Sequence, residues 1–444
     1  MKSNPDLSNV SEILTSVMSS PGKVAVVGSL NVDLTAKVAQ FPAPGETVPA
    51  SDLINGPGGK SSNQAVAASK IGANVAMVGA VGNDAYGSFV QRSLEDVGVD
   101  TSRVVARDLP TGTALITVNA GGENTIMYSA GANRSVSRAD LKSAADLLQS
   151  ADVVALGFES PASVVAAAID VARSGAPTNT GTSASRKPES IANVDQNNAP
   201  HQQRNNGRDS GEKRRSPQII LNYSPIIDVD LGLVRGVDIV VVNEIELRAL
   251  GERYGSAQLP TRERGGSASV VGSSADGHGD EHGGAGPADE LALHNAADCA
   301  AKDHGASENE LFAIAKQIVA ALGLRGLIVT LGPEGCLVVE SEESSGSGGP
   351  APTDDANPID AANPTAISST AHGVYVQGYP VDAVDSTGCG DCFMGTVAAA
   401  IASGRGLFDS ARLATFVASR AATEQGAQSS YLSADELVGQ LKHK

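Results

Sequence analysis

Residues 385–393 read "DSTGCGDCF" and lie between a short extended run and a helix-forming run of small residues. The stretch contains a C-x-x-C pair, Cys389 and Cys392, with Asp391 between the two thiols. The sequence offers no second Cys/His pair at zinc-ligand spacing, and this late, glycine-rich setting does not suit a thioredoxin-like motif. We therefore expect the aspartate to carry the chemistry of this stretch, and a regulatory role of the thiols stays open.

A strand–turn–helix geometry here exposes the backbone N–H groups of residues 388–391 at a helix N-terminus. Such donors stabilise the charge on a phosphoryl group in transfer, and a carboxylate beside them can take the proton of an attacking alcohol. Asp391 suits that role. The alternative is an ordinary acid in the first turn of a helix, where a negative charge is favoured.

Short apolar runs rich in β-branched residues alternate with helical stretches along most of the chain. Unbroken apolar runs of this kind are typical of strands buried on both faces. The pattern predicts an α/β fold, a doubly wound and mostly parallel sheet with helices on both faces. The predicted strands are 23–28, 75–79, 153–157, 218–222, 238–243 and 326–332.

Helix starts are marked by capping residues and by proline. Residues 307–310 ("SENE") and 433–436 ("SADE") predict capping boxes. Pro161 suits the first turn of a helix. Ser61 or Ser62 is expected to cap a helix that ends at Gly72.

Two segments break the strand–helix rhythm and predict a small antiparallel β subdomain that lies over the main sheet as a lid. Residues 35–54 are extended and rich in proline. Residues 111–130 contain two alternating runs around a "GGEN" turn, which is a hairpin signal.

The 444 residues predict one main domain, 23–432, with an N-terminal extension at 1–22 that we expect to be flexible and a C-terminal helix at 433–444. Polar insertions without apolar periodicity are expected at 176–217, 254–305 and 341–371. A basic run at 204–215 and the pair His278 and His282 fall in these insertions. We interpret both as solvated loop rather than as binding sites.

The formal net charge of −18 argues against generic binding to nucleic acid, which requires a basic surface. Four cysteines are too few and too unevenly spaced for a disulfide framework, so a reducing compartment is the simpler interpretation. The first residues do not resemble a signal peptide, and no apolar stretch is long enough to span a membrane. We expect a cytoplasmic protein without membrane partners, and import into an organelle stays open.

Polar side chains follow several predicted strands at their carboxyl ends, where ligands bind in open α/β sheets. Asn31 and Asp33, in "GSLNVD", alternate and can hold two hydroxyls of a polyol. Glu159 and Asn243 follow two other strands. The alternative is a set of ordinary Asn- and Asp-rich turns.

Two glycine-rich loops can present backbone amides to anions or hydroxyls. One is "GPGGKSSNQA" at 56–65, and the other is "TLGPEG" at 330–335. Each alone is weak evidence, because ordinary turns have the same composition.

Seven motifs in chain order, "GSLNVD", "GGKxxNQA", "ESP", "NE", "TLGPEG", "GxGD" and "GAQSS", make the chain similar to the ribokinase-like carbohydrate kinases. The resemblance covers 23–432 apart from the insertions. It implies an ATP-dependent kinase for D-ribose with Asp391 as the general base on the primary hydroxyl. The implied sugar-binding residues are Asn31, Asp33, Gly59, Lys60, Asn63, Glu159 and Asp391.

The resemblance also implies the sites for ATP and ions. The implied ATP-binding residues are Asn243, Thr330, Gly332, Gly335, Gly390 and Thr415, and the anion hole is Gly388, Cys389 and Gly390. Glu246 is implied to orient Mg²⁺ through water. The implied K⁺ site is Asp385, Thr387, Ala421, Glu424, Gly426 and Ser430. A homodimer through the β lid follows from the same resemblance.

Other substrates stay open, namely 2-deoxyribose, a ketohexose or a nucleoside, as does a catalytically weak sugar-binding regulatory relative. The polar "NxD" and "GGKxxN" groups favour a small free polyol over a nucleoside. Cys389 stands where the family usually has Ala, Gly or Ser. Because a thiol at a helix N-terminus has a lowered pKa, we expect mild oxidation to link Cys389 to Cys392 and block the anion hole.

Overall fold

The computed structural model describes residues 7–175, 216–254, 308–341 and 371–442. Most of the three polar insertions, the capping residue Ser307, the basic run and the pair His278 and His282 lie outside the described residues. Within the described ranges, none of the helices combines the length and apolar character needed to cross a membrane.

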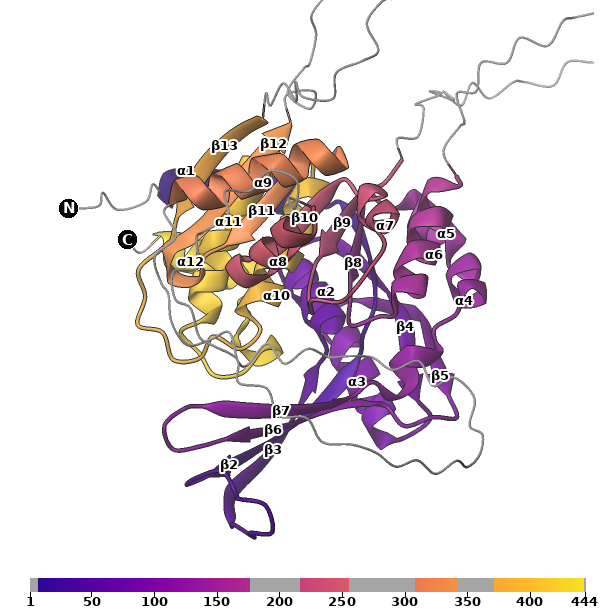
Figure 1. The fold of residues 1–444 in the computed structure, drawn as a ribbon, viewed down its shortest axis with the longest axis vertical. Helices are drawn as coiled ribbons and strands as arrows, with labels where there is room; N and C mark the ends of the chain where they lie inside the picture. The colour runs from indigo at the N-terminus through magenta and orange to yellow at the C-terminus, as the bar shows by residue number, and fades with distance from the viewer. Residues whose placement is uncertain (1–6, 176–215, 255–307, 342–370, 443–444) are drawn as a thin grey trace, which may run out of the picture.

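The main sheet has nine strands in the order β13-β12-β11-β10-β9-β8-β1-β4-β5 (Figure 1). All neighbours from β11 to β5 pair in parallel, and the two strands at the other edge pair antiparallel. The predicted doubly wound α/β fold is confirmed. The strands are β1 (Lys23–Val27), β4 (Asn74–Gly82), β5 (Asp100–Arg107), β8 (Val153–Gly157), β9 (Gln218–Asn222), β10 (Ile239–Asn243), β11 (Gly326–Thr330), β12 (Gly335–Ser341) and β13 (Ala371–Gln377).

Helices cover both faces of the sheet. Alternate residues of each central strand point to opposite faces, so each strand contributes to two hydrophobic cores. Val24 and Val26 of β1 belong to one hydrophobic core and Ala25 and Val27 to the other. The first core includes α1 (Leu7–Ser19), α2 (Lys60–Lys70), α3 (Ala85–Glu95), α10 (Cys389–Ala402), α11 (Leu407–Ala421) and α12 (Ala434–Lys442). The second includes α4 (Arg138–Ser143), α5 (Ala145–Ser150), α6 (Ala162–Arg173), α7 (Leu231–Arg235), α8 (Glu244–Tyr254) and α9 (Glu308–Leu322).

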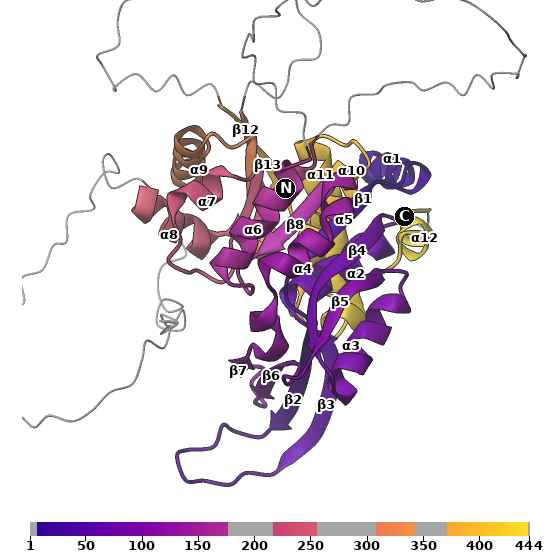
Figure 2. The same ribbon diagram turned by 90° about the vertical axis from the view of Figure 1, so that its right-hand side faces the viewer.

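A second sheet of four strands, in the order β3-β2-β6-β7, projects from the main body as the predicted lid (Figures 1 and 2). Its strands are β2 (Asn31–Val38), β3 (Ala50–Gly58), β6 (Gly112–Val118) and β7 (Asn124–Ser129). Two antiparallel hairpins are joined by a parallel pairing of β2 with β6. The sequence predicted the hairpin but not this central pairing, because strand partners far apart in the chain leave no local signal.

The N-terminal segment differs from the expected flexible extension, since residues 7–19 form α1. Its apolar residues Val10, Ile13, Leu14 and Val17 are buried and recur at helical spacing. They pack the helix against α11 and α12, and Figure 2 shows α1 beside α12. This helical period was present in the sequence and was missed.

Two capping predictions have different outcomes. The box at 433–436 is confirmed, since the amide of Ser433 donates to Glu436 Oε2 at 2.7 Å and the amide of Glu436 donates to Ser433 Oγ at 3.4 Å. The prediction for Ser61 or Ser62 is wrong, because the N-cap of α2 is Gly59, which precedes both serines and provides no side-chain cap. Both serines lie inside the helix and are buried.

Candidate active site

Helices α2 and α10 pack closely at Gly395, and this contact brings two distant parts of the chain together. A Cβ atom at Gly395 would lie 2.3 Å from the carbonyl oxygen of Gln64 and 2.7 Å from Cβ of Ala67. No residue other than glycine permits that approach without movement of the backbone. The first turns of both helices therefore share one polar centre.

Asp391 occupies this centre. It lies in the first turn of α10, yet its side chain is only 7% exposed. Asn63 Nδ2 donates to its Oδ2 at 2.9 Å, and Gln64 Nε2 donates to its Oδ1 at 3.3 Å. Both carboxylate oxygens thus face α2. This geometry argues against the alternative of an ordinary first-turn acid, which solvent would hydrate.

The N-terminus of α10 is shaped by Gly388, which has a left-handed φ of 73° and provides no side-chain cap. A Cβ atom at Gly388 would lie 2.6 Å from Cβ of Ala427 and from Oη of Tyr431. Tyr431 Oη also donates to the carbonyl oxygen of Gly388 at 2.7 Å. The turn is held by its neighbours, and no side chain caps the first turn of α10, although the amide of Cys389 donates to the carbonyl oxygen of Ser386 at 3.2 Å. An uncapped helix N-terminus of this kind suits an anion.

Three carboxylates, Asp391, Glu159 and Glu246, act on Lys60, the first residue of α2. The charge of Asp391 raises the pKa of Lys60 against the effect of burial, and Glu159 and Glu246 add to the increase. Burial, together with the charges of Glu159 and Asp391, raises the pKa of Asp33 to about 6. The centre therefore concentrates negative charge around a single ammonium group.

Glu159 connects the ends of two strands to the glycine-rich loop. The hydroxyl of Ser29 and the amide of Lys60 both donate to Glu159 Oε2, the latter at 2.9 Å. Burial raises the pKa of Glu159, and the nearby charge of Lys60 and these hydrogen bonds oppose that increase. Glu159 and Lys60, two of the residues implied to hold the sugar, are thus joined directly.

Asn31 and Asp33 lie on the same face of β2, two residues apart. Asn31 Oδ1 accepts a hydrogen bond from Asn133 Nδ2 at 2.8 Å, and the same amide of Asn133 bonds both backbone groups of Leu30. Asn133, in the 3-10 helix Gly131–Ser135, was not identified from the sequence. Its surroundings in the sequence, "AGANRSV" at 130–136, give no signal for this role.

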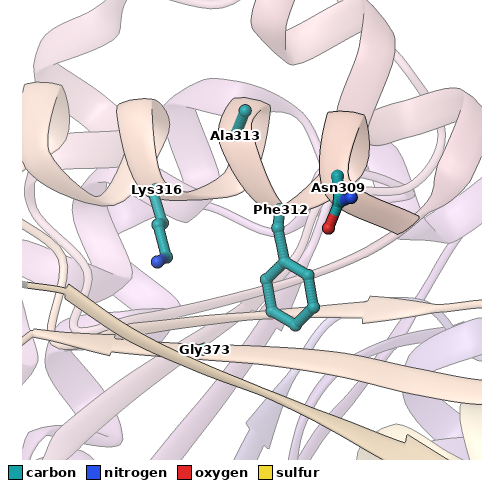
Figure 3. A pocket seen from close by; sticks show the side chains of 5 residues that line it. All are labelled: Asn309, Phe312, Ala313, Lys316 and Gly373. Carbon is teal, nitrogen blue, oxygen red and sulfur yellow. The ribbon is translucent and has the colours of Figure 1, made fainter. Parts of the chain in front are cut away.

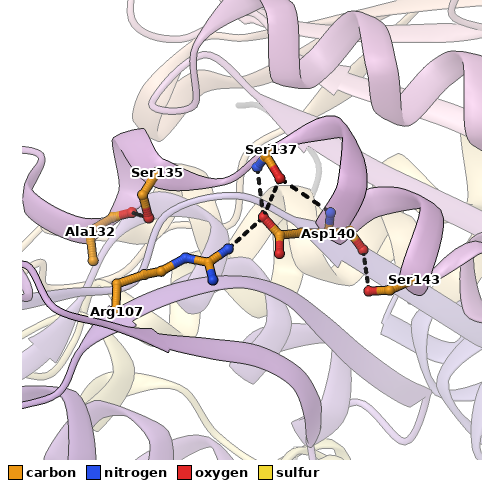
Figure 4. A network of polar contacts seen from close by, with 6 residues as sticks. All are labelled: Arg107, Ala132, Ser135, Ser137, Asp140 and Ser143. Carbon is orange, nitrogen blue, oxygen red and sulfur yellow. Dashed lines mark hydrogen bonds and ion pairs between the residues drawn. The ribbon is translucent and has the colours of Figure 1, made fainter.

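The segment that carries Asn133 is anchored by a polar network around Asp140 (Figure 4). Ser137 and Asp140 form a capping box at the start of α4, and Arg107 Nη2 donates to Asp140 Oδ2 at 2.6 Å. Burial raises the pKa of Asp140, but the hydrogen bonds from Ser137 and Arg107 outweigh it and lower the pKa overall. The network therefore holds the segment that carries Asn133 against the end of β5.

Four of the six residues expected to bind ATP lie at the carboxyl ends of β10 and β11 or in the turn that follows β11. Asn243 and Thr330 are register partners in the two strands. Asn243 and Glu246 exchange side-chain and backbone hydrogen bonds of 2.8 Å each at the start of α8. Gly332 and Gly335 bound a short 3-10 turn after β11. These neighbours are consistent with one nucleotide surface.

Thr415 differs from the other residues expected to bind ATP. It is buried in α11, and its hydroxyl donates to the carbonyl oxygen of Ala411 at 2.8 Å. Cys336 Sγ lies 3.5 Å from the same hydroxyl. The hydroxyl hydrogen of Thr415 is therefore already used within the helix, and the expectation that Thr415 binds ATP stays a prediction.

Asp385 joins the two loops of the expected K⁺ site. The amide of Thr387 donates to its Oδ1 and the amide of Gly426 to its Oδ2, each at 2.9 Å. Burial raises the pKa of Asp385, but bonds from Thr387 and Gly426 outweigh it and lower the pKa overall. Ser430 is buried nearby in the chain, whereas Glu424 is exposed, and Ala421 ends α11.

The expectation of a reactive thiol pair is not supported by the local electrostatics. Burial, with the charges of Asp385 and Asp391, raises the pKa of Cys389 to about 11. Burial also raises the pKa of Cys392, which is 0% exposed. The expected lowering of the Cys389 pKa at the helix N-terminus is therefore wrong, because desolvation and two carboxylates outweigh the helix dipole.

Among the residues that the structure describes, no three or more His, Cys, Asp or Glu side chains form a cluster that could hold a metal ion. A small surface pocket of about 330 Å³ lies elsewhere, between α9 and β13, lined by Asn309, Phe312, Ala313, Lys316 and Gly373 (Figure 3). None of its lining residues belongs to the centre around Asp391.

A family model described as pfkB family carbohydrate kinase matches residues 21–199 and 291–434. The chain is 40% identical to the ribokinase of Mus musculus over 157 residues, which are 35% of this chain and 49% of that protein. It is 39% identical to the deoxyribokinase of Salmonella typhimurium over 139 residues, 31% of this chain and 45% of that protein. The chain spans about half the length of these curated relatives.

Solved structures have a similar fold. A crystal structure of ribokinase from Thermotoga maritima superposes with a TM-score of 0.62 at 22% identity, covering 95% of this chain and 100% of that chain. The structure of Arabidopsis thaliana ribokinase complexed with ribose and ATP gives a TM-score of 0.61 at 20% identity, covering 95% and 99%. At these identities the likeness establishes the fold.

Proposed function

Because this chain belongs to the pfkB family of carbohydrate kinases, we propose that it transfers the terminal phosphoryl group of ATP to the primary hydroxyl of D-ribose, giving D-ribose 5-phosphate. The observation that carries the proposal is Asp391. This buried carboxylate lies at the start of α10 and is bonded to Asn63 of the glycine-rich loop helix. A base and an anion-binding helix terminus at one point suit phosphoryl transfer to an alcohol.

In the proposed reaction, Asp391 accepts the proton of the primary hydroxyl as the sugar oxygen attacks the terminal phosphorus. The bond from that phosphorus to the bridging oxygen of ATP breaks, and ADP leaves. The amides at the start of α10 stabilise the charge on the transferring group. Lys60 adds positive charge at the same centre, where Asp391 already raises its pKa.

The sugar is proposed to lie among Asn31, Asp33 and Glu159, with Gly59, Lys60 and Asn63 on the facing loop. Carboxylates and amides in one cluster match the alternating hydroxyls of a free pentose. Support comes from the buried bonds that fix these groups, Asn133 to Asn31 and Ser29 to Glu159. The groups are held in place by other protein atoms, which reduces the entropy lost on binding.

ATP is proposed to lie along the carboxyl ends of β10 and β11, with its phosphates directed to Gly390. Mg²⁺ would neutralise charge on the phosphates, and Glu246 fits a role through water. Its carboxylate is 7% exposed, and its pKa is raised mainly by burial. Mg²⁺ usually keeps several waters and takes few protein ligands, which agrees with one carboxylate rather than a cluster.

K⁺ is proposed to bind beside the anion hole, held by the Asp385 carboxylate and by oxygens of Thr387, Ala421, Glu424, Gly426 and Ser430. The lowered pKa of Asp385 keeps this ligand charged. Asp385 already bonds both loops. The ion would add charge that fixes the loop before α10, without a part in bond breaking.

A homodimer through the lid is also proposed. Strand register places Leu53, Leu115 and Met127 on one face of the lid, because Ala36 pairs with Leu53 and Leu115 pairs with Met127 and Leu34. These three side chains are 75%, 44% and 64% exposed. The opposite face carries Asp33 and Tyr128 together with Ile54 and Ile126, which are 48% and 58% exposed. A second copy would cover the apolar face.

A second candidate substrate is 2-deoxyribose, since a deoxyribokinase is among the matching relatives. The experiment is ADP release by the purified protein with D-ribose, 2-deoxyribose, a ketohexose and adenosine, with and without K⁺. The highest kcat/KM with D-ribose would support the first proposal. Turnover only with another acceptor would identify that acceptor, rather than D-ribose, as the substrate. A folded protein that binds sugar without turnover would support the regulatory alternative.

A further inference from the structure

Gln428 has a buried side-chain amide that links residues 426–431 to α2, the helix that carries Lys60 and Asn63 of the proposed sugar site. It lies in the 3-10 turn Gln428–Ser430, and its side chain is 8% exposed. Its Nε2 donates to Ser62 Oγ at 2.9 Å and to Asn63 Oδ1 at 3.0 Å. A primary amide nitrogen carries two hydrogens, so both are used on α2.

The direction of these bonds determines the orientation of Asn63. A carboxylate only accepts hydrogen bonds, so Asn63 must turn its Nδ2 toward Asp391. Its Oδ1 then needs a donor on the other side, and Gln428 supplies it. An acceptor at 428 would favour the flipped amide, with Asn63 Oδ1 against the carboxylate of Asp391.

We propose that Gln428 is a positioning residue, which fixes the amide of Asn63 and through it the carboxylate of Asp391. The proposal rests on the proposed kinase function of this centre. Gln428 itself does not touch the sugar or ATP. It acts through one intervening side chain, and its effect falls on sugar binding and on proton transfer together.

The backbone around Gln428 is fixed independently from both sides. Lys70, at the end of α2, donates from Nζ to the carbonyl oxygens of Gln428 and Tyr431, the first at 3.4 Å. Tyr431 Oη donates to Gly388 at the start of α10. Residues 428–431 thus join the two helices whose first turns form the centre, so a change at Gln428 leaves this backbone connection in place.

The experiment measures steady-state kinetics of Gln428→Met and Gln428→Glu on the sugar that the wild type phosphorylates best. Methionine keeps the length of the side chain and removes both donors. We expect kcat to fall about tenfold and KM for the sugar to rise, as for loss of a buried hydrogen bond, with KM for ATP unchanged. Glutamate should have a larger effect, because its carboxylate favours the flipped amide of Asn63.

A double-mutant cycle with Asn63→Ala separates positioning from general loosening of the fold. If Gln428 acts through Asn63, Gln428→Met should have little further effect in the Asn63→Ala background. Gln425→Met, at an exposed position of the same loop, is the matched control and should behave as wild type. Wild-type kinetics in both Gln428 variants, additive effects in the cycle, or failure of both variants to fold would overturn the proposal.

The two proposals fail in different ways. A wild type that prefers a sugar other than D-ribose refutes the proposed substrate, and the Gln428 comparison is then made on that sugar. A ribose kinase whose sugar KM and kcat do not respond to Gln428 refutes the positioning role alone.

Discussion

Asn63 Nδ2 lies 2.9 Å from Asp391 Oδ2, although 328 residues separate the two in the chain. The bond joins the first turn of α2 to the first turn of α10, and it is buried. Gly395 makes it possible by letting the two helices approach. The proposed base and the proposed sugar loop are therefore parts of one packed unit rather than of separate loops.

Asp391→Asn should lower kcat by about 10²–10⁴-fold, since it removes the general base while keeping the size of the side chain. The sugar Kd should change far less, because Asn31, Asp33 and Glu159 are untouched. Coupled ADP release and calorimetric titration with the sugar measure the two quantities. Substantial turnover by the variant would mean that Asp391 is not the general base and is an ordinary acid in the first turn of a helix.

Asp33→Asn should abolish sugar binding and yet stabilise the fold at neutral pH. Burial and two nearby carboxylates raise the folded-state pKa of Asp33 from 3.8 to about 6. The folded protein therefore binds this proton more tightly, and the free energy of unfolding falls as pH rises from 3.8 through about 6. Replacing the carboxylate with a neutral amide removes that loss. The free energy of unfolding of the variant should therefore exceed that of the wild type by about 1–2 kcal/mol at pH 7, a value reduced for solvent screening.

Thermal unfolding of wild type and Asp33→Asn at pH 4.5 and pH 7.5 tests the sign. The variant should gain stability over the wild type mainly at the higher pH. In the wild type, the sugar Kd should rise as pH falls below about 6, because the neutral carboxyl loses acceptor capacity. A variant that is less stable at pH 7.5 would mean that the charged carboxylate is better solvated than its burial indicates.

Six of the nine strands of the main sheet could be predicted because each carries its own local signal, whereas β5, β12 and β13 were not predicted. β1, β8 and β9 are unbroken apolar runs, and the structure has strands at the expected places. The parallel pairing of β2 with β6 could not be predicted, since it depends on tertiary contacts. The helix at residues 7–19 could have been predicted, because its buried residues follow the period of 3.6.

The candidate site was predictable to the extent that its residues occur in recognisable motifs. Asn63 and Asp391 were expected together and are bonded. Gln64 and Gln428, which orient these two residues, were not assigned this role, and neither was Asn133, which orients Asn31, because a supporting amide has no spacing of its own. The chemistry of Cys389 was predicted with the wrong sign, since a sequence does not reveal desolvation.

The Cys389 thiol should react slowly at pH 8, because its pKa is raised to about 11 by burial and by Asp385 and Asp391. Iodoacetamide should label it far more slowly than a cysteine in an unfolded peptide, and the rate should rise about tenfold per pH unit. Diamide should leave activity intact at pH 7.5. Fast loss of activity that dithiothreitol reverses would restore the disulfide hypothesis.

Met127→Lys should weaken the proposed dimer, because Met127 is 64% exposed in the apolar face of the lid with Leu53 and Leu115. Two copies of a new charge would meet across a symmetric interface. Light scattering after size exclusion, over a range of concentrations, should show a dimer for wild type and a monomer for the variant. Val384→Lys is the control, since Val384 is 60% exposed outside the lid. A monomeric wild type would refute the dimer.

Asp385→Asn should weaken activation by K⁺ without abolishing catalysis. The carboxylate accepts hydrogen bonds from the amides of Thr387 and Gly426, and these bonds lower its pKa and favour its charged form. Asparagine removes the charge and can accept hydrogen bonds through only one side-chain atom. The loop before α10 therefore becomes less fixed, and the ion is held more weakly.

We expect the K⁺ concentration for half-maximal activity of Asp385→Asn to rise about tenfold, with a smaller change in kcat at saturating K⁺. Gln425→Met, at an exposed position outside the proposed K⁺ ligands, should keep the wild-type K⁺ dependence. If wild-type activity is the same in Na⁺-, K⁺- and choline-based buffers, Asp385 serves only to join the two loops, and Asp385→Asn should then lower the melting temperature rather than the response to any ion.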